Sequence, residues 1–484
     1  MNRNNIWIHV AIAVVLITLA GVLGQISRWK TSLNGPRVEL SRQSVDHLEI
    51  ETWDLQGEAP EVLVRFKSGV TLNEIRRLTA EKNDNLSDEI ESVAGLTVID
   101  DLDNADAQIV ANEYSSMTDT VEYAEINYQI KLDDPVQKSV FQVRLGRREP
   151  SAGMPNDPMF ADQWALNNSG ANGGKERADL DALEAWTHTK GSDEVVVAVL
   201  DSGVDFTHVD LIENMWVRPA NVPAYSDDEL GTFNDINGYN GTDAIRDPMD
   251  DNGHGTHCAG IIGAEGDNAI GVTGINQKVR IMPLKFLGRG GYGSTNDAIE
   301  AINYAIDRKK NGVNVRIISA SWGSTSRSKA LEDTIRAAAD ADILFVAAAG
   351  NDGSDNDRRA HYPSNYDLPN VISVAALDRG DQLASFSNYG LKTVHVAAPG
   401  KDILSTWLNN GYREASGTSM ATPYVSGVAA LIIASDPNIT MKNLRARILG
   451  ASDDLEGLKG KVQTEGRICA ANSLGNIVKE HSHE

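Results

Sequence analysis

The chain has 484 residues, of which 41% are hydrophobic and 23% are charged, and its formal net charge is -24. The length favours more than one folded unit, and the composition is that of a globular chain, not a disordered one. The acidity excludes nucleic acid as an expected partner, because phosphate contacts require a basic face. Two cysteines, Cys258 and Cys469, exclude a disulfide-stapled scaffold, and both are expected to be free thiols.

The N-terminus carries one early positive charge at Arg3, followed by an apolar run over residues 6–26. This pattern is typical of an export signal, although the run is also close to the length that spans a bilayer. We therefore expect residues 1–27 to be a signal peptide or an N-terminal membrane anchor, and the protein to be secreted or held at the cell envelope. Residues 28–60 are polar without a clear period and are expected to be a linker.

Residues 61–132 show alternating strand and helix patterns and predict a small α+β open sandwich. Thr71 is a candidate N-cap for the first helix. The expected elements are a strand at 62–66, a helix at 72–82, a strand at 96–99, a helix at 105–117 and more strand over 121–132. Residues 133–154 are expected to form a cleavable linker, since they contain Arg144, Arg147 and Arg148.

From residue 155 to 478, continuous apolar strands alternate with helical patterns. This arrangement predicts an α/β domain with a mostly parallel central sheet and helices on both faces. The expected strands are 195–200, 280–284, 315–319, 343–348 and 371–375.

Three short segments of this domain carry residues suited to nucleophilic catalysis. Asp201 ends an apolar strand, His254 lies between two glycines before an apolar helix, and Ser419 is expected, exposed, at the N-terminus of another helix. A serine hydroxyl needs a base to take its proton, which an imidazole can do near neutral pH. A buried carboxylate would fix the imidazole tautomer. Asn351, at the end of a further apolar strand, is expected to donate its amide to a developing oxyanion together with the Ser419 N–H.

These segments resemble the subtilisin-like serine proteases, the subtilases. The similarity lies in Asp201-Ser-Gly, in His254-Gly-Thr-His257, in Gly417-Thr-Ser419-Met-Ala-Thr-Pro423, and in Ser321-Trp-Gly and Gly350-Asn351. The resemblance implies an endopeptidase that acts on proteins or peptides through an acyl-enzyme on Ser419. It also implies that His257 is structural. Cys258 takes a position that some thiol-containing members of the family use, and we expect it to be a small buried side chain without a direct functional role.

The same resemblance extends to residues 61–132, which are similar to the family's inhibitory, chaperone-like pro-segment. It implies that the chain is a monomer that cuts itself free of this intramolecular inhibitor within 133–154. A dedicated maturation protease with few substrates and a catalytically silent binding protein remain as alternatives. The intact catalytic set argues against the silent protein.

The resemblance further implies calcium as a structural cofactor, since hard cations prefer oxygen ligands. The matching positions are the side chains of Asp157, Asp210 and Asn268, with backbone carbonyls of Gly266, Ile270 and Val272. Solvated surface acids are the alternative interpretation. A second calcium site in the acid-rich segment 213–250 is left open.

Two segments, Ser321-Trp322-Gly323 and Ala348-Ala349-Gly350, resemble the walls of the pocket for the residue before the scissile bond. Small residues there allow an extended peptide to pair as an added strand. His361 takes a position near the base of this pocket, with an ordinary loop histidine as the alternative. No acid cluster dedicates the pocket to basic residues, which favours a broad endopeptidase.

Overall fold

The computed structural model describes residues 61–132, 140–141, 153–227, 231–242 and 247–475. The predictions for residues 1–27 and 28–60, and for most of 133–154, lie outside these residues.

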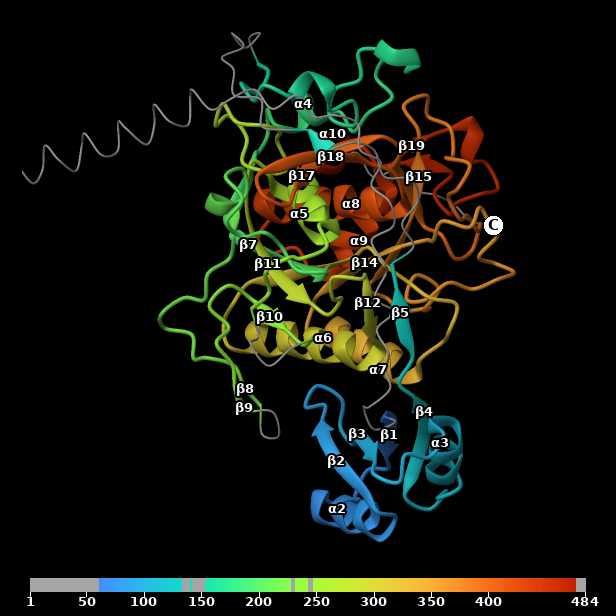
Figure 1. Cartoon of the computed structure of the whole chain (residues 1–484). Coiled ribbons are helices and arrows are strands. Elements are labelled where there is room, and N and C mark those ends of the chain that lie inside the picture. The colour runs from blue at the N-terminus through green and yellow to red at the C-terminus, as the bar shows by residue number, and fades with distance from the viewer. Residues whose placement is uncertain (1–60, 133–139, 142–152, 228–230, 243–246, 476–484) are drawn as a thin grey trace, which may run out of the picture. The chain divides into compact units, whose positions relative to one another are not determined.

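The segment 61–132 is a four-stranded antiparallel sheet in the order β2-β3-β1-β4, with two helices packed against it (Figure 1). Its elements are β1 (Glu61–Phe66), α2 (Leu72–Glu81), β2 (Asp84–Glu89), β3 (Leu96–Asp101), α3 (Ala107–Ser115), β4 (Val121–Ile126) and β5 (Gln129–Lys131). Thr71 accepts a hydrogen bond from the Glu74 N–H, as expected of an N-cap. The sequence prediction missed β2, because Asp84-Asn-Leu-Ser-Asp-Glu is too polar to be recognised as a strand.

The rest of the chain is built on a nine-stranded sheet in the order β10-β11-β7-β13-β14-β15-β16-β20-β19. All neighbours in it are parallel except β19 and β20. Its strands are β7 (Gly191–Asp201), β10 (Tyr239–Asn240), β11 (Lys278–Lys285), β13 (Val315–Ala320), β14 (Leu344–Ala348), β15 (Val371–Leu377), β16 (Val396–Pro399), β19 (Asp453–Asp454) and β20 (Gly466–Arg467).

Helices cover both faces of this sheet, and the predicted α/β architecture is confirmed. Helices α5 and α8 pack on one face, and α6 and α7 on the other (Figure 1). The alternating side chains of β7 join these two cores, with Val197 in one and Ala198 in the other. The helices are α4 (Ala182–Ala185), α5 (His254–Gly263), α6 (Thr295–Lys310), α7 (Lys329–Asp340), α8 (Thr418–Ser435), α9 (Met441–Gly450) and α10 (Ala470–Leu474).

Three small sheets of two or three strands accompany the central sheet among the described residues. They are β8 (Ser226–Asp227) with β9 (Gly231–Thr232), β12 (Tyr292–Ser294) with β5, and β17 (Ile403–Trp407) with β18 (Gly411–Ala415) and β6 (Val140–Phe141). Among the described helices, α8 alone has the length and hydropathy of a membrane span, but 89% of it is buried inside the protein. It is therefore a core helix of the domain. Cys258 and Cys469 are both buried and, as expected, neither forms a disulfide.

Candidate active site

Asp201 and His254 meet where β7 ends and α5 begins. The His254 Nδ1 atom lies 2.8 Å from Oδ1 and 2.9 Å from Oδ2 of Asp201. Asp201 is fully buried, and its carboxylate also accepts the Ser202 N–H at 2.7 Å. A proton on Nδ1 that is donated to the carboxylate leaves Nε2 as the basic nitrogen of the ring. The pair therefore has the arrangement that was expected of a general base and its orienting carboxylate.

The sequence analysis missed Asp250, which anchors the first turn of α5. Gly253, with φ 106°, precedes the helix and has no side chain that could cap it. The buried Asp250 carboxylate instead accepts the N–H groups of Asn252, Gly253 and Thr256, each at 2.9 Å. It also accepts the Ser202 hydroxyl at 2.9 Å, beside Asp201. The sequence signal that could have identified Asp250 is the presence of an acid shortly before a predicted helix, since Asp is a favoured capping residue.

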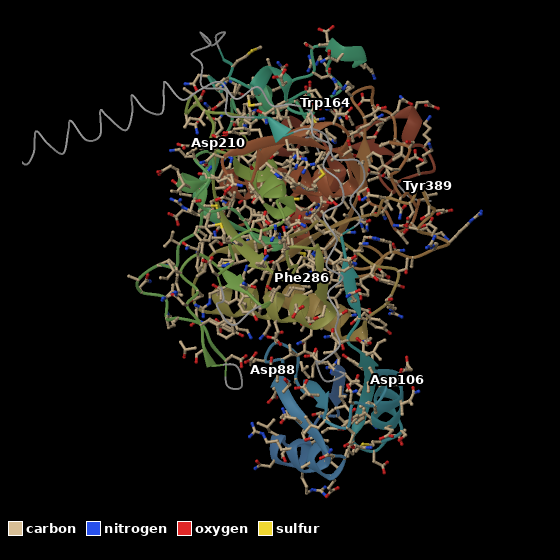
Figure 2. All side chains as sticks on the ribbon, viewed as in Figure 1. Asp88, Asp106, Trp164, Asp210, Phe286 and Tyr389 are labelled. Carbon is tan, nitrogen blue, oxygen red and sulfur yellow. The ribbon has the colours of Figure 1, made fainter. Side chains whose placement is uncertain are left out.

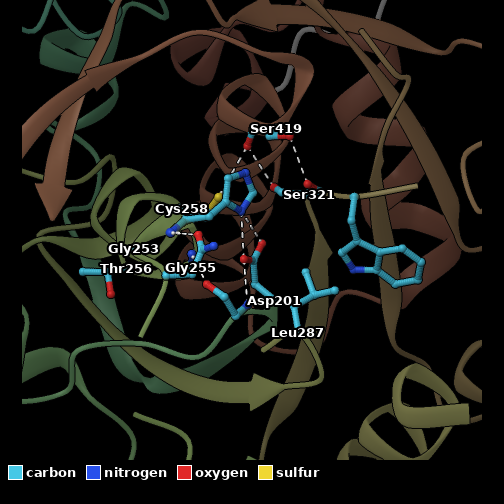
Figure 3. Close-up of polar contacts among 12 residues, drawn as sticks. Asp201, Gly253, Gly255, Thr256, Cys258, Leu287, Ser321 and Ser419 are labelled. Carbon is cyan, nitrogen blue, oxygen red and sulfur yellow. Dashed lines mark hydrogen bonds and ion pairs between the residues drawn. The ribbon is translucent and has the colours of Figure 1, made fainter. Parts of the chain in front are cut away.

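Ser419 is the second residue of α8, and its hydroxyl donates to the Ser321 carbonyl at 3.0 Å (Figure 3). In return, the Ser321 hydroxyl donates to the Ser419 carbonyl at 2.8 Å, and the Cys258 thiol approaches the same oxygen at 3.5 Å. Pro423, four residues on, has no N–H to offer this carbonyl, so the helix leaves it to these side chains.

The expectation that Ser419 is exposed is wrong. The residue is only 4% exposed in the structure. Its backbone carbonyl is contacted by Ser321 and Cys258, which come from other parts of the chain.

Asn351 lies beside the start of α8. Its Oδ1 atom accepts the Thr418 N–H at 2.8 Å and the Thr418 hydroxyl at 3.1 Å. These two bonds fix the orientation of the amide, so that Nδ2 is its donor end. The Thr418 hydroxyl in turn accepts the Gly350 N–H at 3.2 Å. Asn351 and the N-terminus of α8 are thus brought together, as predicted for a pair of oxyanion donors.

The two residues that follow the His254 turn serve the packing of α5. His257 is fully buried, and its Nε2 lies 3.1 Å from the Ile403 carbonyl and 2.9 Å from the Arg413 carbonyl, so this nitrogen donates. Burial lowers the pKa of His257 to about 3. Cys258 is 1% exposed. Its sulfur and ligand atoms of Asp201 and His254 all lie within 4.8 Å of one another, and the same sulfur lies 3.5 Å from the Ser419 carbonyl oxygen.

The segments predicted to form the pocket walls lie on either side of His361. A Cβ atom added to Gly323 would lie 2.0 Å from His361 Cε1, and one on Gly350 would lie 3.1 Å from Nε2. Ala348 is the buried last residue of β14. The Trp322 indole, however, lies in the core and donates to the Leu200 carbonyl at 2.9 Å, so only its backbone is available to a pocket.

The structure brings together the three side chains predicted to bind calcium (Asp210 is labelled in Figure 2). Asn268 donates its amide to Asp210 at 2.8 Å, and its N–H lies 3.4 Å from Asp157. Burial raises the pKa of Asp157 to about 6 and that of Asp210 to about 7, and the charge of Asp157 adds to the second effect. Facing buried carboxylates with raised pKa values fit a hard cation, although Asn268 must turn its amide oxygen inward to bind it.

The backbone positions predicted for calcium belong to the same loop. It follows α5, and it contains Gly266 and Ile270; Val272 at its end donates its N–H to Asp210 at 2.9 Å. The carboxylate of Glu265 lies 3.4 Å from the Asn268 amide nitrogen and was missed by the sequence analysis.

The comparisons with known proteins agree with this geometry. The Subtilase family model matches residues 192–467. The chain is 34% identical over 414 residues to "Thermophilic serine proteinase" of Bacillus sp. (strain AK1), covering 86% of this chain and 87% of that protein. It is 34% identical over 320 residues to "Thermitase" of Thermoactinomyces vulgaris, covering 66% of this chain and 99% of that protein. It is also 34% identical over 321 residues to "Halolysin-like extracellular serine protease Nep" of Natrialba magadii, covering 64% and 52% of the two chains. The chain therefore belongs to the subtilase family and is a serine endopeptidase.

Proposed function

We propose that Asp201, His254 and Ser419 form the catalytic triad of this endopeptidase. The observation that carries the proposal is the His254 Nδ1 atom held by both oxygens of the buried Asp201 carboxylate, at the start of the helix that packs against Ser419. His254 Nε2 takes the proton of the Ser419 hydroxyl as its oxygen attacks a peptide carbonyl, and then returns this proton to the leaving amine. Asp201 stabilises the imidazolium, and water releases the acyl group from Ser419.

The oxyanion of the tetrahedral intermediate binds to Asn351 Nδ2 and the Ser419 N–H in this proposal. The two Thr418 bonds to Asn351 Oδ1 support this role, because they orient the amide before the substrate arrives. Preorganised donors stabilise a developing charge without a reorganisation cost. The backbone of 321–323 and 348–350, with His361 between these walls, holds the residue before the scissile bond.

Residues 61–132 act as an inhibitory pro-segment of the same chain in our proposal. Strand β5 pairs antiparallel with β12, with Ile130 opposite Gly293, and Leu132 continues the pairing to the Gly291 carbonyl at 2.9 Å. The Glu125 carboxylate accepts the N–H groups of Lys329 and Ala330 at the N-terminus of α7, where negative charge is favoured. A strand added in this way is how an extended peptide binds.

Self-cleavage within 133–154 then separates the inhibitor from the peptidase. Attachment to the same chain gives the pro-segment a high effective concentration, which the cut removes. The apolar N-terminal run supports export of the protein, and the printed name of the Natrialba magadii relative describes that protein as extracellular.

A Ser419→Ala variant tests the triad and the self-cleavage together. We expect it to fold, to resist labelling by a fluorophosphonate, and to keep its pro-segment, so that its mass exceeds that of the mature wild type by at least residues 61–132. Fluorophosphonate labelling of the variant at another serine would refute the assignment of Ser419. Maturation of the variant to the wild-type N-terminus, in a host without other proteases, would refute self-cleavage alone.

Calcium has a structural role in this proposal, bound by Asp157, Asp210 and Asn268 with carbonyls of the 266–272 loop. When bound, the ion neutralises the two facing carboxylates and stabilises the native state by mass action. Excess chelator should lower the melting temperature of the wild type while leaving the kcat of the still-folded enzyme nearly unchanged. In Asp210→Asn the melting temperature should respond much less to the chelator. An equal response in both proteins would exclude this loop as the site.

A further inference from the structure

A group of buried carboxylates lies where segment 61–132 contacts the peptidase domain (Asp88 is labelled in Figure 2). Asp88 comes from β2, Asp227 from β8 and Glu300 from α6, and an oxygen of each lies within 4.8 Å of the others. These residues are 3%, 3% and 4% exposed, respectively. We call the three side chains the interface carboxylates.

Hydrogen bonds between segment 61–132 and α6 surround the interface carboxylates. The Asn303 side chain on α6 accepts the Ser92 N–H at 3.0 Å and donates to the Glu91 carboxylate. The same amide nitrogen lies 3.3 Å from the Tyr225 hydroxyl. Glu91 therefore borders the group as a fourth carboxylate, and burial, with Asp227 nearby, raises its pKa to about 7.

Glu300 gives a second and separate indication of a ligand. Its Oε1 atom is buried and has no hydrogen-bond donor among the residues that the structure describes. Arg308 lies 5.5 Å over the Tyr225 ring, but its guanidinium pairs with Asp235 at 3.0 Å and with Asp307 at 2.5 Å. A buried carboxylate without a compensating charge is strongly unfavourable, so this position calls for a positive partner.

We propose that the interface carboxylates bind a divalent cation, calcium, which ties segment 61–132 to the peptidase domain. An all-oxygen group from three separate elements suits a hard cation, and Glu91 and water can complete its shell. The site differs from the loop of Asp157 and Asp210, because one of its ligands belongs to segment 61–132. Departure of that segment leaves only Asp227 and Glu300, so the ion and the segment hold each other in place.

The consequence for activation rests on the proposed inhibitory role of segment 61–132. Calcium at this site strengthens the inhibitor, and loss of the ion favours its release. Binding itself does not depend on inhibition, and the test is made on a protein that cannot cut itself.

The experiment uses the full-length Ser419→Ala chain, stripped of metal and titrated with calcium. Variants on this background are Glu300→Gln, Asp88→Asn, Asp210→Asn and, as a control, Glu113→Gln, whose carboxylate is exposed and pairs with Lys82. Calorimetry should show one calcium fewer in Glu300→Gln and in Asp88→Asn than in Glu113→Gln. With calcium at ten times its Kd, mass action predicts roughly tenfold slower hydrogen exchange over residues 84–101 in the parent and in Asp210→Asn, and little slowing in Glu300→Gln.

Two results would overturn the proposal. One is an unchanged calcium stoichiometry in both Glu300→Gln and Asp88→Asn, whichever way Asp210→Asn behaves. The other is a slowing of hydrogen exchange over residues 84–101 that occurs on acidification to pH 5 but does not occur on addition of calcium. That result would show that protons, not a metal ion, neutralise the carboxylates. Within the first result, loss of a calcium in Asp210→Asn alone would support the site in the loop of Asp157 and Asp210 and would exclude the interface site.

Discussion

Asp250 accepts five hydrogen bonds at the point where the strand of Asp201 and the helix of His254 meet. Its donors are Ser202, the two residues before α5 (Asn252 and Gly253) and Thr256 in the first turn of α5. One buried carboxylate therefore fixes both halves of the His254–Asp201 pair.

Asp250→Ala should lower kcat by roughly 10- to 100-fold with little change in KM, because small displacements of the proposed base are costly in catalysis, whereas the proposed pocket walls are untouched. Steady-state kinetics on a short peptide substrate measure both. Asp247→Asn, which removes an exposed acid from the same segment, is the control. A rise in KM at constant kcat would assign Asp250 to substrate binding instead.

The candidate catalytic residues were predictable because their chemistry is carried by short contiguous motifs around Asp201, His254 and Ser419. The burial of Ser419 and the inward-facing indole of Trp322 were not, since both depend on contacts between distant parts of the chain. Asp250 was missed for the same reason, because its donors include Ser202, 48 positions away.

At the scale of elements, apolar continuity predicted the central strands of the parallel sheet, β7, β11, β13, β14 and β15, which are buried on both faces. The residues of β2 are mostly polar, so this strand has no continuous apolar run to predict it. It is defined by its backbone pairing with β3. The short strands β12 and β20 were missed in the same way, and so were the buried strands β16 and β17. Hydrophobic pattern thus predicted the central strands of the sheet, and failed for short strands nearer its edges and for strands that backbone pairing defines.

Helix α7 is the element through which Glu125 holds the proposed pro-segment. Glu125→Ala should shorten the lag before activity appears in the wild-type background, by roughly tenfold for a loss of about 1.4 kcal/mol, because it removes a charged acceptor from a helix N-terminus. A continuous peptidase assay after refolding measures the lag. Glu122→Ala, an exposed acid that pairs with Arg65 at 3.4 Å, is the control. Equal lags in the two variants would show that the cap does not retain the segment.

At the scale of the whole molecule, His257 couples folding to pH. It joins α5 to β17 and β18, and burial lowers its folded pKa to about 3, against an ordinary value of 6.5. Between these two values the unfolded chain binds a proton that the folded protein does not. The contribution of His257 to the free energy of unfolding is therefore fully present above pH 6.5 and is lost as the pH falls toward 3. The slope of this free energy against pH approaches that of one bound proton.

His257→Gln keeps a donor for the Ile403 and Arg413 carbonyls but never takes up that proton. On the Ser419→Ala background, urea unfolding between pH 6.5 and 4.5 should show a weaker pH dependence for this variant by up to about one proton. The exposed His188, replaced by glutamine, should leave the dependence unchanged. The same slope in all three proteins would show that His257 is protonated in the folded state.

Pro423 leaves the Ser419 carbonyl without an N–H donor from its own helix, and this carbonyl accepts the Ser321 hydroxyl instead. The Ser419 hydroxyl donates in the other direction, to the Ser321 carbonyl. In the proposed site, that carbonyl belongs to the wall along which a substrate peptide would align its own N–H groups. A peptide N–H that pairs with it would compete with the Ser419 hydroxyl for the same oxygen. Occupancy of the proposed wall would then bear on the side-chain torsion of Ser419.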